Sequence, residues 1–159
     1  MSVAFTREED LEATAADLPD RPISQHPNLV TQAGLDQLEA ALNEARAAYT
    51  AAQTEGGISD DRTAMARAAR DLRYYSARRA TAQFTATPAK PTTVVFGASV
   101  TFERDDGRVQ TFRIVGEDEA DPAQGSVSYV SPLAQALLGK GVGDEAKVAG
   151  QDVEITGIA

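Results

Sequence analysis

The chain has 159 residues, no cysteine and a formal net charge of −9 at pH 7. These values exclude disulfides and thiolate metal sites, and they argue against independent binding to duplex DNA, which needs a broad basic face. No apolar run approaches the roughly 20 residues that span a membrane, and the acidic N-terminus does not resemble a signal peptide. We therefore expect a cytoplasmic protein with no membrane contact.

Residues 1–28 are predicted to form an acidic, largely disordered leader. They carry acidic residues, alanine and three prolines, Pro19, Pro22 and Pro27. A short helix over residues 6–16 fits the local pattern, but the prolines favour an extended path after it.

Residues 29–87 are predicted to form an antiparallel coiled-coil hairpin. Apolar residues recur at steps of three and four in two stretches, as in a heptad seam. Gly56-Gly57 separates the stretches, and Ser59 can cap the second helix. Each helix should have about 25 residues, with the hairpin tip at about 55–61. The predicted seam residues are Leu35, Leu38, Leu42, Ala45, Tyr49 and Ala52, then Met65, Ala68, Leu72, Tyr75, Arg79 and Ala82.

After a linker at 88–93, residues 94–159 are predicted to form a small antiparallel sheet with one helix. Alternating apolar residues predict strands at the four ranges 94–103, 108–115, 126–130 and 147–158. Ser131 is placed to cap a short helix with Pro132 at its first position, and Gly139 ends it. The whole chain is therefore predicted to be of the α+β class.

The sequence lacks the parts of a conventional enzyme site. Its single histidine, His26, lies among prolines, so a catalytic triad or a histidine-based zinc site cannot be assembled. No phosphate-binding glycine loop is present. We expect no enzymatic activity and no cofactor held by this chain alone.

Two features of the hairpin have a chemical interpretation. Asp60 and Asp61 are predicted beside the tip, where paired carboxylates can help to hold a Mg²⁺ ion bound incompletely by another protein; equally, they can stabilise the start of a helix. Residues 62–90 contain seven basic residues and one acid. Arg62, Arg67 and Arg70 could contact RNA phosphates or an acidic protein wall, or could simply cover an alanine-rich seam.

The stretch SYVSPLAQALLGKGVGD at 128–144 resembles the C-terminal signature of the bacterial Gre transcript-cleavage factors, as do 94–100 and 112–119. The resemblance covers residues 91–158, and TQAGL at 31–35 looks like the start of the family's helical hairpin. It implies a monomer that binds RNA polymerase. The coiled coil would enter the secondary channel, with the nascent RNA 3′ end as an optional contact. An FKBP-like domain would hold the channel rim, a role we assign to Ser131, Pro132 and Lys140. Asp60 and Asp61 would assist a catalytic Mg²⁺ shared with the polymerase.

The chain departs from the family at the tip. Gly57 stands where the family has an acid, and Asp60 replaces a glutamate. Each arm is also about one heptad shorter, which removes roughly 10 Å of reach. Two mechanisms therefore remain open, stimulation of transcript cleavage and occupancy of the channel without cleavage. A coiled-coil adaptor or chaperone-like module for another client is a third interpretation.

Overall fold

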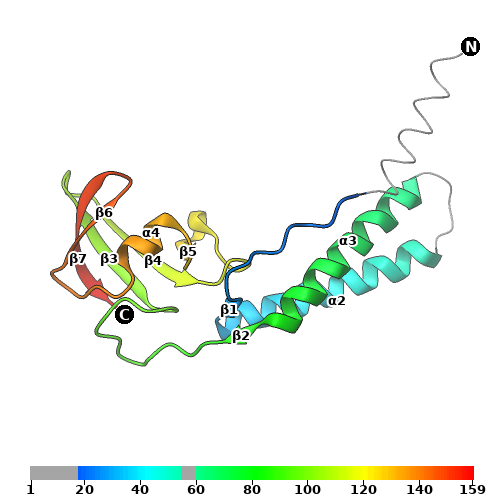
Figure 1. Ribbon diagram of the computed structural model, residues 1–159, viewed down its shortest axis with the longest axis horizontal. Coiled ribbons are helices and arrows are strands. Elements are labelled where there is room, and N and C mark those ends of the chain that lie inside the picture. The colour runs from blue at the N-terminus through cyan, green and yellow to red at the C-terminus, as the bar shows by residue number, and fades with distance from the viewer. Residues whose placement is uncertain (1–17, 55–59) are drawn as a thin grey trace, which may run out of the picture. The chain divides into compact units, whose positions relative to one another are not determined.

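The computed structural model of the protein describes residues 18–54 and 60–159 (Figure 1). Its contacts divide the chain into two compact units that do not follow sequence order. The hairpin unit contains the segment that ends at Gln25 together with Leu38–Thr81, and the sheet unit contains His26–Gln37 and Ala82–Ala159. This division differs from the predicted boundaries after residues 28 and 87, because residues 26–37 and 82–87 belong to the sheet unit.

Two long helices supply most of the described part of the hairpin unit. Helix α2 is Gln32–Thr54, of 23 residues, and α3 is Asp60–Thr81, of 22 residues. Each is roughly 35 Å long at 1.5 Å per residue. The first residues of α2, 32–37, belong to the sheet unit. The helices run antiparallel, because Glu39 near the start of α2 pairs with Arg79 near the end of α3. The buried positions confirm much of the predicted seam: Leu38, Leu42, Ala45 and Ala68.

The last turn of α3 differs from the predicted seam. The side chain of Arg79, which was expected on the seam, remains 40% exposed. Arg78 is instead buried, with 1% exposure. An α-helix drifts by about 20° per heptad relative to a strict seven-residue repeat, so the buried face has moved around the helix by its final turn.

A five-stranded sheet forms the sheet unit, in the order β5-β4-β3-β7-β6. Strands β4 and β5 are parallel, whereas the other neighbouring pairs are antiparallel. The α+β class is confirmed, but the sheet is mixed rather than purely antiparallel. The bounds are β3 Ser99–Arg104, β4 Val109–Val115, β5 Ser126–Ser128, β6 Glu145–Val148 and β7 Gln151–Ile158, with the 3₁₀ helix η1 at Pro122–Gln124.

Two predicted strands differ from the observed ones. The predicted strand at 147–158 is part of a hairpin, because Ala149 and Gly150 have positive φ angles of 52° and 76° and turn the chain between β6 and β7. The predicted strand at 94–103 begins only at Ser99. Residues 105–107 form the turn between β3 and β4. Here the Asp106 carboxylate accepts a hydrogen bond from the backbone N–H of Arg108, which lowers the pKa of Asp106.

Helix α4, Pro132–Leu137, packs on the sheet. Its Ala134 and Leu137 are buried among inward-facing strand residues, while Leu133 and Ala136 are partly buried against the same core. Alternation along each strand places one set of side chains in this core. The fully buried members include Phe102, Ile114, Leu137, Ile155 and Val100.

A short parallel pair brings the chain around residue 30 to the sheet unit. Strand β1, Leu29–Val30, pairs with β2, Gln83–Phe84. The carbonyl of Pro27 also accepts a hydrogen bond from the Tyr129 hydroxyl. Part of the predicted disordered leader therefore has defined contacts; residues 1–17, with the helix expected at 6–16, lie outside the described residues.

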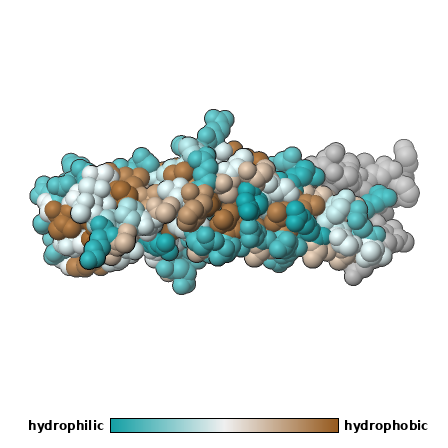
Figure 2. Space-filling view, turned by 90° about the horizontal axis from the view of Figure 1, so that it is seen from below, coloured by the Kyte–Doolittle hydropathy of each residue, from teal (hydrophilic) through white to brown (hydrophobic). Residues whose placement is uncertain are grey.

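Hydrophilic side chains cover most of the face visible in Figure 2, with apolar residues in small areas between them. Among the helices that the structure describes, none is both long and apolar enough to cross a membrane.

Candidate functional site

The predicted tip lies mostly outside the described part of the chain. Asp60 is the first residue of α3 and Asp61 follows it. Their side chains, and all of residues 55–59, are not among the described groups. The roles of Asp60 and Asp61 therefore stay predictions. Within the described ranges, no cluster of three or more potential ligands could hold a metal ion.

The arginines of α3 differ in their exposure and in the ion pairs that they make. Arg67 is exposed and makes no ion pair with a described residue. Arg70 lies 3.9 Å from Asp71, and its buried Nε finds no hydrogen-bond acceptor among the described residues. Arg73 makes a much closer ion pair at 2.7 Å. Arg62 is also exposed, so the predicted contact residues Arg62, Arg67 and Arg70 share one helix with different surroundings.

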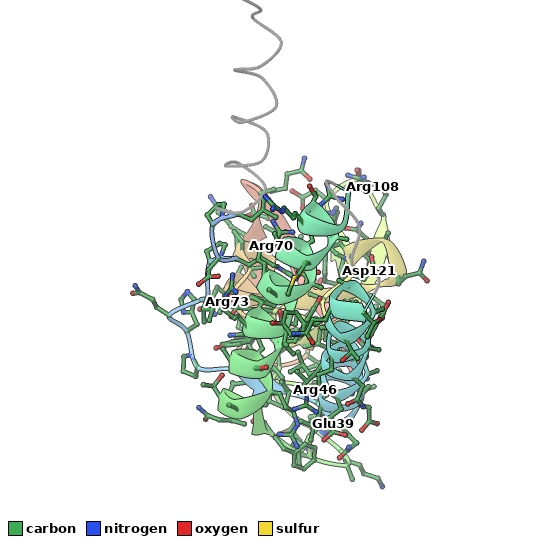
Figure 3. The ribbon with its side chains drawn as sticks, turned by 90° about the vertical axis from the view of Figure 1, so that its right-hand side faces the viewer. Glu39, Arg46, Arg70, Arg73, Arg108 and Asp121 are labelled. Carbon is green, nitrogen blue, oxygen red and sulfur yellow. The ribbon has the colours of Figure 1, made fainter. Side chains whose placement is uncertain are left out.

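An extended segment, residues 18–25, lies along α3; we call it the strap. Asp20 supplies the carboxylate that pairs with Arg73, and Figure 3 shows Arg70 and Arg73 on the same helix. The guanidinium of Arg21 lies 3.8 Å from the ring centroid of Tyr74. A hydrogen bond with the Tyr75 side chain raises the pKa of Arg21. Sequence reasoning missed these contacts, because acidic and proline-rich composition alone indicates disorder.

The residues assigned to the polymerase rim have clear local roles around α4. The Ser131 hydroxyl caps the helix by accepting a hydrogen bond from the Ala134 N–H at 3.2 Å, and Pro132 occupies the first turn. The Lys140 carbonyl accepts a hydrogen bond from the Val94 N–H. Ser131 and Lys140 are half-buried, whereas Pro132 is exposed. The predicted cap is confirmed, while contact with a rim stays a prediction.

The acid at the end of the 128–144 stretch closes a turn. The Asp144 carboxylate accepts a hydrogen bond from the Gly141 N–H at 2.8 Å. Gly139 and Gly143 have positive φ angles of 82° and 90°, a conformation that favours glycine. Much of this stretch is therefore explained by the turn and helix that it builds.

Thr31 and Glu119 form a second feature that the sequence pattern does not reveal. The Thr31 hydroxyl lies 2.7 Å from both carboxylate oxygens of Glu119. The same hydroxyl accepts a hydrogen bond from the Gly34 N–H at 3.1 Å, as a helix cap does. Thr31 therefore caps α2, and Glu119, 88 residues away along the chain, holds the cap in place.

The outer face of the sheet carries a row of like charges. In the strand register, Glu154 of β7 lies opposite Glu103 of β3 on one side and Glu145 of β6 on the other. All three are exposed. Like charges directly opposite each other destabilise a sheet, so this row costs stability.

Replacing Glu154 with glutamine is expected to raise the free energy of unfolding of the sheet unit by about 0.5 kcal/mol, because it removes both repulsive pairs. Urea unfolding of the full chain, followed by NMR of the sheet amides, measures this change. Asp152→Asn is the matched control, since Asp152 lies opposite Lys147 and its loss removes an attraction. An equal gain in both variants would show that overall charge, not register, is responsible.

Comparison with known proteins places this chain in a family. The model of the family described as "Transcription elongation factor, GreA/GreB, C-term" matches residues 89–158. A GreA of Hyphomonas neptunium is 58% identical over 57 residues, or 35% of this chain and 36% of that protein. The alignment with the solved structure of Gfh1 from Thermus thermophilus covers 84% of this chain and 99% of that one at 19% identity, with a TM-score of 0.40. A GreA of Desulfovibrio desulfuricans is 35% identical over 127 residues, which cover 79% of this chain and 72% of that protein. With this extent of similarity, the chain belongs to the GreA/GreB family of transcription elongation factors.

Proposed function

We propose that this protein binds RNA polymerase and modulates elongation by placing the α2–α3 hairpin in the secondary channel, with the α4 side of the sheet unit on the channel rim. Family membership supports the elongation role. The observation that carries the proposed mode of action is the pair of 23- and 22-residue helices. A pair of slender helices with an alanine-containing seam is suited to entering a channel and is too thin to enclose a substrate pocket.

The alanine-rich packing supports this view of the hairpin. A groove of about 220 Å³ remains between α2 and α3. Small side chains form much of its wall, so the helices bury little apolar volume between them. The groove residues are Ala41, Glu44, Ala45, Ala48, Ala68, Asp71 and Tyr75. In this proposal the protein has no catalytic site of its own and acts in the compartment of its polymerase, the cytoplasm.

Between the two open mechanisms, we favour occupancy of the channel with weak or absent cleavage. Gly57 replaces one family acid, and each arm is about a heptad short, so the tip has lost both a carboxylate and reach. A Mg²⁺ ion shared with the polymerase would activate water in a cleavage reaction. In that case Asp60 and Asp61 would supply oxygen atoms near it, and a shortfall of roughly 10 Å would prevent this.

A cleavage assay on a backtracked elongation complex tests the mechanism. Wild-type protein should bind polymerase at micromolar concentration and stimulate little or no cleavage. Strong Mg²⁺-dependent cleavage that is lost in Asp60→Ala, with binding retained, would show that the tip does reach the catalytic centre. Absence of polymerase binding by interferometry, and absence of its subunits in a pull-down, would instead favour the adaptor interpretation.

The double substitution of Arg67 and Arg70 by alanine is expected to weaken polymerase binding about five-fold at low salt and to flatten its salt dependence, because exposed charge contacts are weak individually and screened by ions. Interferometry at several salt concentrations measures both effects. Arg46→Ala removes an exposed arginine from the other arm and serves as the control. An unchanged salt slope in the double variant would mean that these two arginines only solvate the hairpin.

A further inference from the structure

The strap places two unlike groups on one surface of α3. The Asp20 carboxylate lies 2.7 Å from the Nε of Arg73. The next residue, Arg21, lays its planar guanidinium over the ring of Tyr74, 3.8 Å from the centroid, and lies 5.2 Å from that of Tyr75. The Asp20 carboxylate thus covers the Arg73 guanidinium, and the planar Arg21 guanidinium covers the neighbouring ring of Tyr74.

The surface under the strap combines arginine with tyrosine. Arg70, Arg73 and Tyr74 are spaced by three and four residues, which places them on neighbouring positions of the helix surface. Single-stranded nucleic acids are bound by such combinations, in which arginines contact phosphates and aromatic rings stack on bases. Asp20 stands where a phosphate would meet Arg73, and Arg21 stands where a base would stack on Tyr74.

We propose that the strap, through Asp20 and Arg21, covers the Arg73 and Tyr74 part of a single-stranded RNA-binding surface formed by Arg70, Arg73 and Tyr74, and competes with RNA for it. The proposal adds contact with single-stranded RNA to the proposed function, and it rests on the placement of the hairpin in the secondary channel. An acidic protein wall would account for the arginines, but it gives no role to the stacked face of Tyr74.

The contacts of the strap are of a kind that an anionic ligand can replace. The side chains of Asp20 and Arg73 are 68% and 54% exposed, and exposed ion pairs contribute little and are screened by salt. The second ion pair, between Arg21 and Asp71, is longer at 3.4 Å. Pro19 and Pro22 restrict the strap to extended conformations. The strap therefore gains little conformational entropy when it leaves α3 and loses little when it returns.

The test compares binding of a short fluorescein-labelled single-stranded RNA by full-length variants at low salt, measured by fluorescence anisotropy. Asp20→Ala/Arg21→Ala, which leaves net charge unchanged, should bind the RNA about five-fold more tightly than wild type, because the two ion pairs and the cation–π contacts of the strap no longer compete. Adding Tyr74→Leu to this variant should remove most of the gain. Far-UV circular dichroism confirms that the helices remain folded.

Asp106→Ala/Arg108→Ala is the matched control. It also removes an exposed acid–arginine pair at 2.7 Å, but from a turn of the sheet unit. Equal affinities of wild type and the strap variant, or an equal gain in the control, would overturn the proposal. So would a gain that survives Tyr74→Leu, or a gain in polymerase affinity with RNA affinity unchanged. Polymerase binding by wild type is measured separately, so failure of the strap proposal would leave the proposed function standing.

Discussion

Replacing Leu137 with alanine should lower the free energy of unfolding of the sheet unit by about 2–5 kcal/mol. Leu137 is fully buried, and it is the larger of the two α4 residues, Ala134 and Leu137, that are buried in the core. Truncation removes apolar area from the core and leaves a cavity that the surrounding strands cannot fill completely. Because Ser131 and Pro132 are held at the start of this helix, polymerase binding should weaken as well.

Amide hydrogen exchange of β3 and β7 measures the loss of stability in the sheet unit separately from the helices of the hairpin unit. Val142→Ala is the control, because Val142 is apolar but 61% exposed, and its truncation should change stability by no more than about 0.5 kcal/mol. Similar exchange rates in the two variants would mean that α4 does not anchor the core.

Gly116→Ala should lower the free energy of unfolding of the sheet unit by about 1–3 kcal/mol and displace the segment around β1. A Cβ atom at Gly116 would clash with the backbone carbonyl oxygen of Leu29. Backbone cannot rotate away as a flexible side chain can, so the segment has to move. The amides of Gln83 and Thr85, which donate hydrogen bonds to the carbonyls of Asn28 and Val30 at 2.8 and 3.0 Å, should then exchange faster.

The matched control for this change is Gly157→Ala. A Cβ atom there would meet the Thr101 side chain at an ordinary distance of 3.7 Å, so Gln83 and Thr85 should keep their protection. Protection that is also kept in Gly116→Ala would show that the segment tolerates the added methyl group, contrary to this account.

In the hairpin and around α4, local sequence patterns correctly predicted several buried residues and the residue that caps the helix. Leu38, Leu42 and Ala68 are buried as their spacing predicts, because a seam of period three and four fixes which side of a helix faces its partner. Ser131 caps α4 as expected, because capping depends on residues only three positions apart.

Long-range contacts account for the differences. The 147–158 strand is interrupted by a turn at Ala149-Gly150, for which alternating polarity gives no signal. Residues 26–31 contact the sheet unit through partners such as Glu119 and Tyr129, about 90 to 100 positions along the chain. The strap is docked by single ion pairs and one stacked guanidinium, and composition does not distinguish such a segment from a disordered one.

The sequence by itself determined the α+β class, the two-helix hairpin, the capped α4 helix and the family, because these depend on periodicity, local hydrogen bonds and a dense motif. Only the tertiary structure decided that β4 and β5 are parallel, that Arg78 rather than Arg79 is buried, and that Asp20 and Arg21 cover the arginine and tyrosine face of α3. These features depend on which distant segments meet, and such meetings are set by the packing of the whole chain and not by the spacing of neighbouring residues.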